Sequence, residues 1–163
     1  MQLTDLPALA GLLPEVLSGN WSVAQLQSQL HSNHEFLVLV KNATAQENAA
    51  LPETGTSSEI IVGFAEFYCV LDECHLLNFV IFRTWRQQGL AQLFIRELLH
   101  EIRERGCVQC LLEVRRSNLP AVRLYEKTGF VLNGVRPGYY PPLEKDGLRE
   151  DALLYSWSLS ASD

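Results

Sequence analysis

Glu113 is the residue whose position most needs a chemical explanation. It lies inside the apolar run Leu111–Val114, where an ionisable side chain needs a partner or a function, because an uncompensated buried charge is costly. Arg115, two residues on along the same face of the predicted strand, could be that partner. Tyr125, in the predicted helix that follows, also has two interpretations: a core residue with its hydroxyl at the edge, or a functional phenol. The residues alone leave both questions open.

The turn Arg86–Ala91 could bind a phosphate group. It carries Gly89, follows the strand-like run 76–82 and precedes a strongly periodic helix. Backbone N–H groups and the positive end of a helix attract anions at such a turn, although an ordinary strand-to-helix connection has the same pattern. Asn118 heads the next predicted helix, where it is either a plain N-cap or a ligand contact.

The four cysteines, Cys69, Cys74, Cys107 and Cys110, raise the question of a metal site. Cys107 and Cys110 open a strand-like run, and residues three apart on a strand face opposite sides, so we expect them not to share one metal ion. Cys69 and Cys74 flank a short turn and could be cross-strand neighbours. A disulfide between them is geometrically conceivable, but a reducing compartment disfavours it. We therefore predict reduced thiols and no metal.

The bulk composition describes an ordinary globular protein. The chain has 163 residues, of which 47% are hydrophobic and 20% charged, and its formal net charge is −6. This acidic balance argues against non-specific nucleic-acid binding, which needs a basic surface, and weakly favours a basic partner. No apolar run is long enough to span a membrane and no signal peptide is recognisable, so we expect a cytoplasmic protein.

Hydrophobic periodicity predicts alternating helices and strands in a single domain over 1–163. The predicted helices cover residues 5–17, 22–30, 89–105 and 118–127. The predicted strands cover residues 36–41, 60–70, 74–82, 108–114, 131–136 and 152–159. A strand, a long helix and a second strand form a right-handed crossover with parallel strands, so the fold class is α+β, a mixed sheet with helices on both faces. The polar stretch 42–59 predicts a long mobile loop, and the Pro-, Gly- and Tyr-rich residues after 136 predict a second loop.

Several motifs, taken together and in order, resemble those of the GNAT acetyltransferase superfamily. More narrowly they resemble the bacterial RimI family, which acetylates the N-terminal alanine of a small-subunit ribosomal protein. The motifs are Val70–Glu73, Arg86–Ala91 (the Gln/Arg-x-x-Gly-x-Gly/Ala turn), Leu112–Arg115 with Ser117–Asn118, Leu124–Glu126 with Gly129–Phe130, Arg136, Tyr139–Pro141 and Arg149–Ala152. The turn alone indicates the superfamily. Glu113, Tyr125 and Tyr139–Pro141 together indicate the narrower family.

This resemblance implies a GNAT-like sheet whose two central parallel strands splay apart, with acetyl-CoA as co-substrate in the gap and no metal. It implies that backbone groups of Phe79, Val80 and Ile81 bind the acetyl-pantetheine arm, and that Asn118 contacts the coenzyme. It also implies that backbone amides cradle the pyrophosphate. Those amides belong to Gln87, Gln88, Gly89, Leu90, Ala91 and Gln92.

The resemblance further implies Glu113 as general base and Tyr125 as general acid in direct transfer within a ternary complex. An α-amine has a pKa of about 8 and must lose a proton before it attacks a thioester. Tyr139 and Tyr140 lie in the predicted second loop. They either anchor that loop by aromatic packing or form a wall of the groove for the substrate's N-terminus.

The leading hypothesis is an N-α-acetyltransferase whose partner is the N-terminus of a basic ribosomal protein, with neither nucleic acid nor membrane involved. The nearest alternative is a GNAT enzyme that acetylates protein lysines or a small-molecule amine. A second alternative is a non-catalytic acetyl-CoA-binding module, although a sensor would need neither Glu113 nor Tyr125.

Overall fold

The computed structural model describes residues 34–42, 59–145 and 147–159. The predicted helices at 5–17 and 22–30, and nearly all of the predicted loop at 42–59, lie outside these ranges. The elements in order are β1 (Glu35–Asn42), β2 (Glu59–Val70), β3 (Glu73–Ile81), the 3-10 helix η3 (Arg83–Trp85), α4 (Leu90–Glu104), β4 (Gln109–Arg115), α5 (Leu119–Lys127), β5 (Val131–Tyr140) and β6 (Glu150–Ser158). Neither α-helix in the described ranges is long and apolar enough to cross a membrane.

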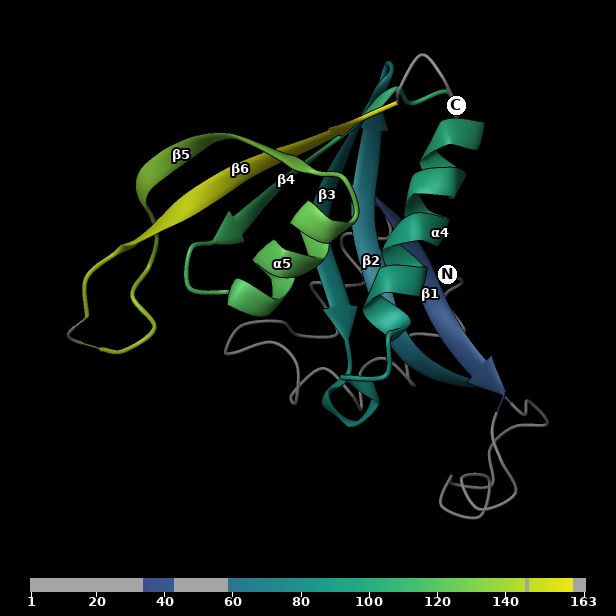
Figure 1. The fold of residues 1–163 in the computed structure, drawn as a ribbon, viewed down its shortest axis with the longest axis horizontal. Helices are drawn as coiled ribbons and strands as arrows, with labels where there is room; N and C mark the ends of the chain where they lie inside the picture. The colour runs from purple at the N-terminus through teal and green to yellow at the C-terminus, as the bar shows by residue number, and fades with distance from the viewer. Residues whose placement is uncertain (1–33, 43–58, 146, 160–163) are drawn as a thin grey trace. The chain divides into compact units, whose positions relative to one another are not determined.

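The strands form one mixed sheet in the order β1-β2-β3-β4-β6-β5 (Figure 1). β3 and β4 are parallel and α4 connects them, whereas β6 runs antiparallel to both β4 and β5. The predicted mixed α+β sheet with parallel central strands is therefore confirmed. The register of β3 and β4 extends only from Glu73↔Gln109 to Leu76↔Leu112, although both strands continue beyond it.

By their packing, the residues divide into two compact units, and β2 and β3 pass through both. In the described part of the first unit, Phe64 and Phe82 are buried with their ring centroids 6.3 Å apart. This unit also buries a carboxylate. Glu66 is 0% exposed, and its two oxygens lie 2.8 Å from His34 Nδ1 and 2.6 Å from Asn78 Nδ2. Burying this charge requires such partners, because an unpaired carboxylate in the core is costly.

The second unit contains α5 and all of α4 except its first residue, Leu90. α4 buries one apolar face, formed by Phe94, Ile95, Leu98, Leu99 and Ile102. Arg105, at the end of α4, lies over the ring of Phe67, while the next residue of β2, Tyr68, stacks on His75 of β3. Because adjacent strand residues point to opposite faces, α4 covers the face opposite Tyr68 and His75.

β5 is longer than the sequence predicts. It continues through Pro137 and Gly138 to Tyr140, so the expected loop position of Tyr139 and Tyr140 is wrong. The register against β6 shifts between Arg136 and Tyr140, and this irregularity accommodates residues that a regular strand disfavours. Gly138 has a φ of 56° and its N–H donates to Asp151 Oδ1 at 2.9 Å. Figure 1 shows β5 and β6 as one long, twisted antiparallel ribbon.

A methyl group at Gly63 should destabilise the first unit. A Cβ there would lie 2.5 Å from the Val80 carbonyl oxygen and 2.8 Å from Ile81 Cδ1, and the backbone atom cannot move aside cheaply. We expect Gly63→Ala to lower the free energy of unfolding by about 2 kcal/mol, measured by urea denaturation. Gly134→Ala is the matched control, because its Cβ would meet only a flexible Leu154 methyl at 3.4 Å. Equal stability of the two variants would contradict this close approach.

Candidate active site

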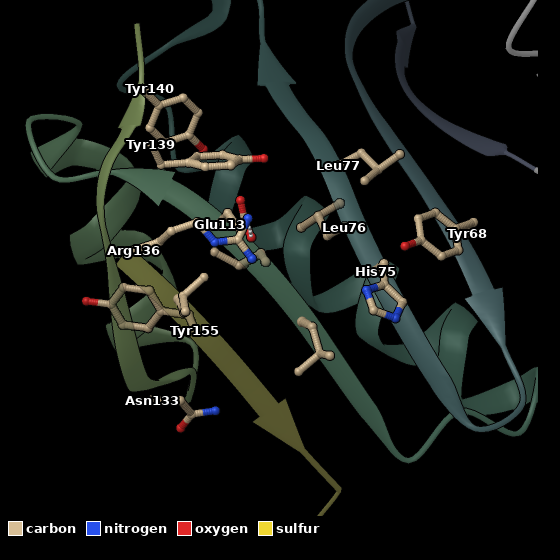
Figure 2. Close-up of a pocket in the computed structure, with 13 residues that line it drawn as sticks. Tyr68, His75, Leu76, Leu77, Glu113, Asn133, Arg136, Tyr139, Tyr140 and Tyr155 are labelled. Carbon is tan, nitrogen blue, oxygen red and sulfur yellow. Dashed lines mark ion pairs between the residues drawn. The ribbon is translucent and has the colours of Figure 1, made fainter. Parts of the chain in front are cut away.

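A cavity of about 620 Å³ opens on the second unit, on the sheet face that carries Tyr68 and His75 (Figure 2). Its volume is in the range of ligand-binding clefts. Polar and aromatic side chains from several strands line it together with leucines. The lining residues are Tyr68, His75, Leu76, Leu77, Leu111, Leu112, Glu113, Asn133, Arg136, Tyr139, Tyr140, Leu154 and Tyr155. The predicted site residues Glu113, Tyr139 and Tyr140 thus lie in one cavity.

Glu113 points into this cavity and pairs with Arg136. The Arg136 Nη1 atom lies 3.0 Å from Glu113 Oε1, and the two side chains are 50% and 30% exposed respectively. Figure 2 shows Arg136 reaching from β5 towards Glu113 on β4. The proposed ion pair between Glu113 and Arg115 is wrong, because Arg115 Nη1 lies 3.0 Å from Glu150 Oε2. Glu113 is therefore held by one arginine yet still reaches solvent.

The two tyrosines of β5 are fixed by cations and by each other. Arg136 lies 4.6 Å from the ring centroid of Tyr139, and Arg115 lies 4.5 Å from that of Tyr140. The rings meet edge to face, with centroids 5.0 Å apart. Burial, then the nearby charge of Glu113, raises the pKa of Tyr140. Tyr140 therefore stays protonated at neutral pH, so that its hydroxyl is available as a hydrogen-bond donor.

Tyr125 lies in the core rather than among the cavity-lining residues. Its side chain is 6% exposed and packs against Phe130 at a centroid distance of 5.5 Å. Burial raises the pKa of the Tyr125 phenol, and the neighbouring Cys110 and Tyr140 raise it further. The interpretation of Tyr125 as a core residue, made from the sequence, is therefore confirmed. A role of Tyr125 as general acid stays a prediction. A protonated phenol carries the proton that this role requires.

The turn before α4 has the backbone of an anion-binding loop. Gln87 and Gly89 both have positive φ, 62° and 78°, and α4 begins directly afterwards at Leu90. The side chain of Arg86 turns back to donate from Nε to the Ile81 carbonyl oxygen at 2.9 Å. Among the described residues, the amides of Gln87, Gln88 and Gly89 donate to no backbone carbonyl. Such amides next to a helix N-terminus suit a phosphate group.

Asn118 is the N-cap of α5. Its side-chain oxygen accepts a hydrogen bond from the Ala121 amide at 3.4 Å, and Pro120 occupies the first turn. The N-cap prediction is therefore confirmed. The coenzyme contact that the resemblance implies for Asn118 stays a prediction.

The four cysteines are free thiols, of which Cys69 is partly exposed and the other three are buried. The expectation that Cys107 and Cys110 face opposite sides of a strand is wrong, because β4 begins only at Gln109. Cys107 lies in the turn after α4, where its amide donates to the Ile102 carbonyl oxygen at 3.0 Å. In the described ranges, no group of three or more ligand side chains is arranged to hold a metal ion.

Arg136 and the Tyr68–His75 stack are the cavity features that sequence reasoning did not assign a role. The rings of Tyr68 and His75 are 4.7 Å apart and nearly parallel, at 6°. A two-residue connection between β2 and β3 places these residues opposite each other, and that spacing could have been read from the sequence. The pairing of Arg136 with Glu113 depends on how β5 and β6 pair, which local patterns do not specify.

Burial of Tyr125 should be measurable as a loss of stability at alkaline pH. Its raised pKa means that the unfolded chain loses this proton first, near the ordinary value of 10.0, so stability is retained below that pH and lost above it. Between pH 9 and 11, the free energy of unfolding should fall by about 1 kcal/mol less in Tyr125→Phe than in the wild type. Tyr139→Phe, which removes a phenol from an exposed side chain, is the matched control. Superimposable curves for all three proteins would refute the burial effect.

The comparison with protein families identifies the fold and its chemistry. Residues 9–130 match the model of the acetyltransferase (GNAT) family. The ribosomal protein bS18-alanine N-acetyltransferase of Escherichia coli K12 is 30% identical over 160 residues, which are 98% of this chain and 95% of that protein.

Solved structures agree with this assignment. The crystal structure of the ribosomal-protein-S18-alanine N-acetyltransferase from Escherichia coli superposes with a TM-score of 0.77 at 28% identity, covering 100% of this chain and 93% of the other. A spermidine N-acetyltransferase chimera from Vibrio cholerae has a TM-score of 0.73 at 19% identity, with 97% and 92% coverage, and shows the fold alone. The chain therefore belongs to the GNAT acetyltransferase family, as a RimI-like, acetyl-CoA-dependent N-acetyltransferase.

Proposed function

We propose that this enzyme transfers the acetyl group of acetyl-CoA to the N-terminal alanine of a small-subunit ribosomal protein, in the cytoplasm. The observation that carries the proposal is the cavity in which Glu113, Arg136, Tyr139 and Tyr140 converge. Similarity to alanine N-acetyltransferases over nearly the whole chain supports the choice of substrate. The net charge of −6 suits a basic protein substrate.

Glu113 is the general base of the proposed reaction. Its carboxylate is 30% exposed, so it accepts the proton of the substrate's α-amine directly or through one water molecule. Arg136, bound at 3.0 Å, holds the carboxylate in one orientation and leaves Oε2 for this task. A fixed base in a partly closed cavity lowers the entropic cost of bringing the reacting groups together.

Tyr139 and Tyr140 bind the first residues of the substrate in this proposal. Their rings form one wall of the cavity, and the two arginines keep them in place. A small alanine side chain fits beside such rings with little desolvation of polar groups. Tyr125 supplies a proton to the departing thiolate, and burial keeps its phenol protonated until that step.

The coenzyme supplies an activated acetyl thioester. The turn at Gln87, Gln88 and Gly89 fits its pyrophosphate, because three amides there lack backbone acceptors within the described residues. The amides of Leu90, Ala91 and Gln92 continue this cradle at the first turn of α4.

The other proposed coenzyme contacts come from β3 and α5. β3 stops pairing with β4 after Leu76, and the later strand residues Phe79, Val80 and Ile81 are assigned to the acetyl-pantetheine arm. Asn118, at the start of α5, is assigned a further contact with the coenzyme. Attack by the free amine then displaces the thiolate in a ternary complex, without an acyl-enzyme intermediate.

A peptide panel tests the substrate. We expect acetyl transfer to peptides that begin with Ala, and turnover at least about tenfold lower for matched peptides beginning with Ser, Met or Gly, because each pocket group is worth roughly 1–3 kcal/mol. A peptide with a blocked N-terminus and an internal Lys, and spermidine as a small amine, complete the panel. Activity confined to either of these last two would overturn the N-terminal assignment while leaving the enzyme class intact.

Glu113→Gln tests the base. Loss of the carboxylate should lower kcat/KM by roughly 10²–10⁴-fold at neutral pH and recover partly at high pH, where more of the amine is already free. Glu101→Gln is the matched control, because Glu101 also pairs with an arginine, Arg105 at 2.8 Å, but on α4 and outside the cavity. A parallel pH–rate profile for Glu113→Gln and wild type would exclude Glu113 as the base.

A further inference from the structure

The irregular part of β5 beside the cavity is held by side chains at or next to the start of β6. The register of the two strands shifts between the pairs Arg136↔Ala152 and Tyr140↔Glu150. The three residues between these pairs on β5, 137–139, therefore face a single residue of β6. A bulge of this kind leaves backbone polar groups without partners in the ladder, and such groups need partners elsewhere.

Two side chains of the motif Arg149–Ala152 supply these partners. Arg149 donates from Nε to the Gly138 carbonyl oxygen at 2.6 Å and from Nη2 to the Tyr139 carbonyl oxygen at 2.5 Å. Asp151 Oδ1 accepts a hydrogen bond from the Gly138 amide at 2.9 Å. The planar guanidinium is a fork whose N–H groups reach both carbonyl oxygens at once. Arg149 and Asp151 are called the hairpin clamp below.

The hairpin clamp fixes the backbone that carries one wall of the cavity. Tyr139 and Tyr140 line the cavity, and their rings lie next to each other (Figure 2). Gly138, directly before them, has a φ of 56°, in the left-handed region that favours glycine. Arg136 and Arg115 lie over the two rings, but such a contact restrains a ring and not the backbone that leads to it. The clamp therefore sets the direction in which both rings project.

Arg149 acts on the backbone and not on a neighbouring carboxylate. The two acidic residues that follow it pair with other arginines, Glu150 with Arg115 at 3.0 Å and Asp151 with Arg116 at 3.1 Å. The hydrogen bonds of the Arg149 guanidinium described above go to neutral carbonyl oxygens. Its contribution thus depends on the geometry of the fork more than on its charge.

We propose that Arg149 is a positioning residue for the acceptor substrate, supported by Asp151. It holds the tyrosine wall in its binding geometry before the substrate arrives, so that acceptor binding does not have to order two aromatic side chains. Loss of the clamp weakens acceptor binding and leaves coenzyme binding unchanged. This inference rests on the proposed function, in which Tyr139 and Tyr140 bind the first residues of the substrate.

Steady-state kinetics of full-length Arg149→Gln test this role with a peptide that begins with Ala. The KM for the peptide should rise roughly 5–20-fold while kcat stays within about twofold of wild type, because the lost binding is shared by the ground state and the transition state. The KM for acetyl-CoA should not change. Arg149 is exposed, so the variant should fold and unfold thermally like the wild type. An unchanged peptide KM, or peptide and acetyl-CoA KM values that rise together, would overturn the proposal.

Two further substitutions separate geometry from charge. Arg149→Lys keeps the charge but has one nitrogen in place of the fork, so its peptide KM should lie between those of Arg149→Gln and wild type. Arg116→Gln is the matched control, because Arg116 pairs with Asp151 Oδ2 and not with the Oδ1 atom that binds Gly138. Its peptide KM should equal the wild-type value. A wild-type KM for Arg149→Lys, or a raised KM for Arg116→Gln, would mean that charge and not the clamp determines acceptor binding.

Tyr139→Ala distinguishes failure of this inference from failure of the proposed function. A raised peptide KM in Tyr139→Ala together with a wild-type KM in Arg149→Gln would overturn the role of Arg149 alone. Wild-type KM values in both variants would overturn the tyrosine wall of the proposed function and this inference with it. If the enzyme acetylates a different acceptor of the panel, that acceptor replaces the peptide in these measurements and the same outcomes decide.

Discussion

The early end of the pairing between β3 and β4 is the constraint on which the site depends. Two parallel strands share register over Glu73–Leu76 and Gln109–Leu112, and then each continues without pairing to the other. Strand backbones that leave a ladder must direct their polar groups elsewhere, because buried N–H and C=O groups require partners. Glu113 is the first residue of β4 beyond that point. The candidate base therefore lies where the pairing of β3 and β4 ends.

On its other side, β4 remains fully paired, and this gives the site its rigidity. Seven consecutive residues of β4, Gln109–Arg115, have register partners on β6, and β6 in turn holds β5. Two ion pairs connect the side chains of these three strands. Arg136 on β5 reaches Glu113 on β4, and Arg115 on β4 reaches Glu150 on β6. Each arginine also lies over a tyrosine ring, so electrostatic and aromatic contacts fix the same side chains that line the cavity.

Local patterns in the sequence were sufficient to predict most of the described helices and strands. The periodic helix α4, the N-cap at Asn118 and the central strands were predicted within one or two residues, because their signals lie within a single element. The extension of β5 was missed, because Pro137 and Gly138 usually end a strand and are tolerated here by an irregularity in the pairing with β6.

Contacts between residues from distant parts of the chain were harder to predict from the sequence. Glu113 was matched to Arg115 by sequence proximity, whereas the observed partner Arg136 comes from another strand. The position of Cys107 was missed for a related reason, since β4 begins only at Gln109 and Cys107 lies in the turn after α4. Proximity in sequence thus predicts elements well and contacts between elements poorly.

The buried Glu66 network has a consequence for how β2 finds its place. β2 is a long strand of mostly apolar residues, and such a strand could slide along β3 with little change in hydrophobic burial. A slip of one residue would point the Glu66 carboxylate to the opposite face, away from Asn78 and His34, at the cost of an uncompensated charge. The buried carboxylate thereby favours one register of β2 over its one-residue slips. It adds little net stability to the correct pairing and heavily penalises the incorrect ones.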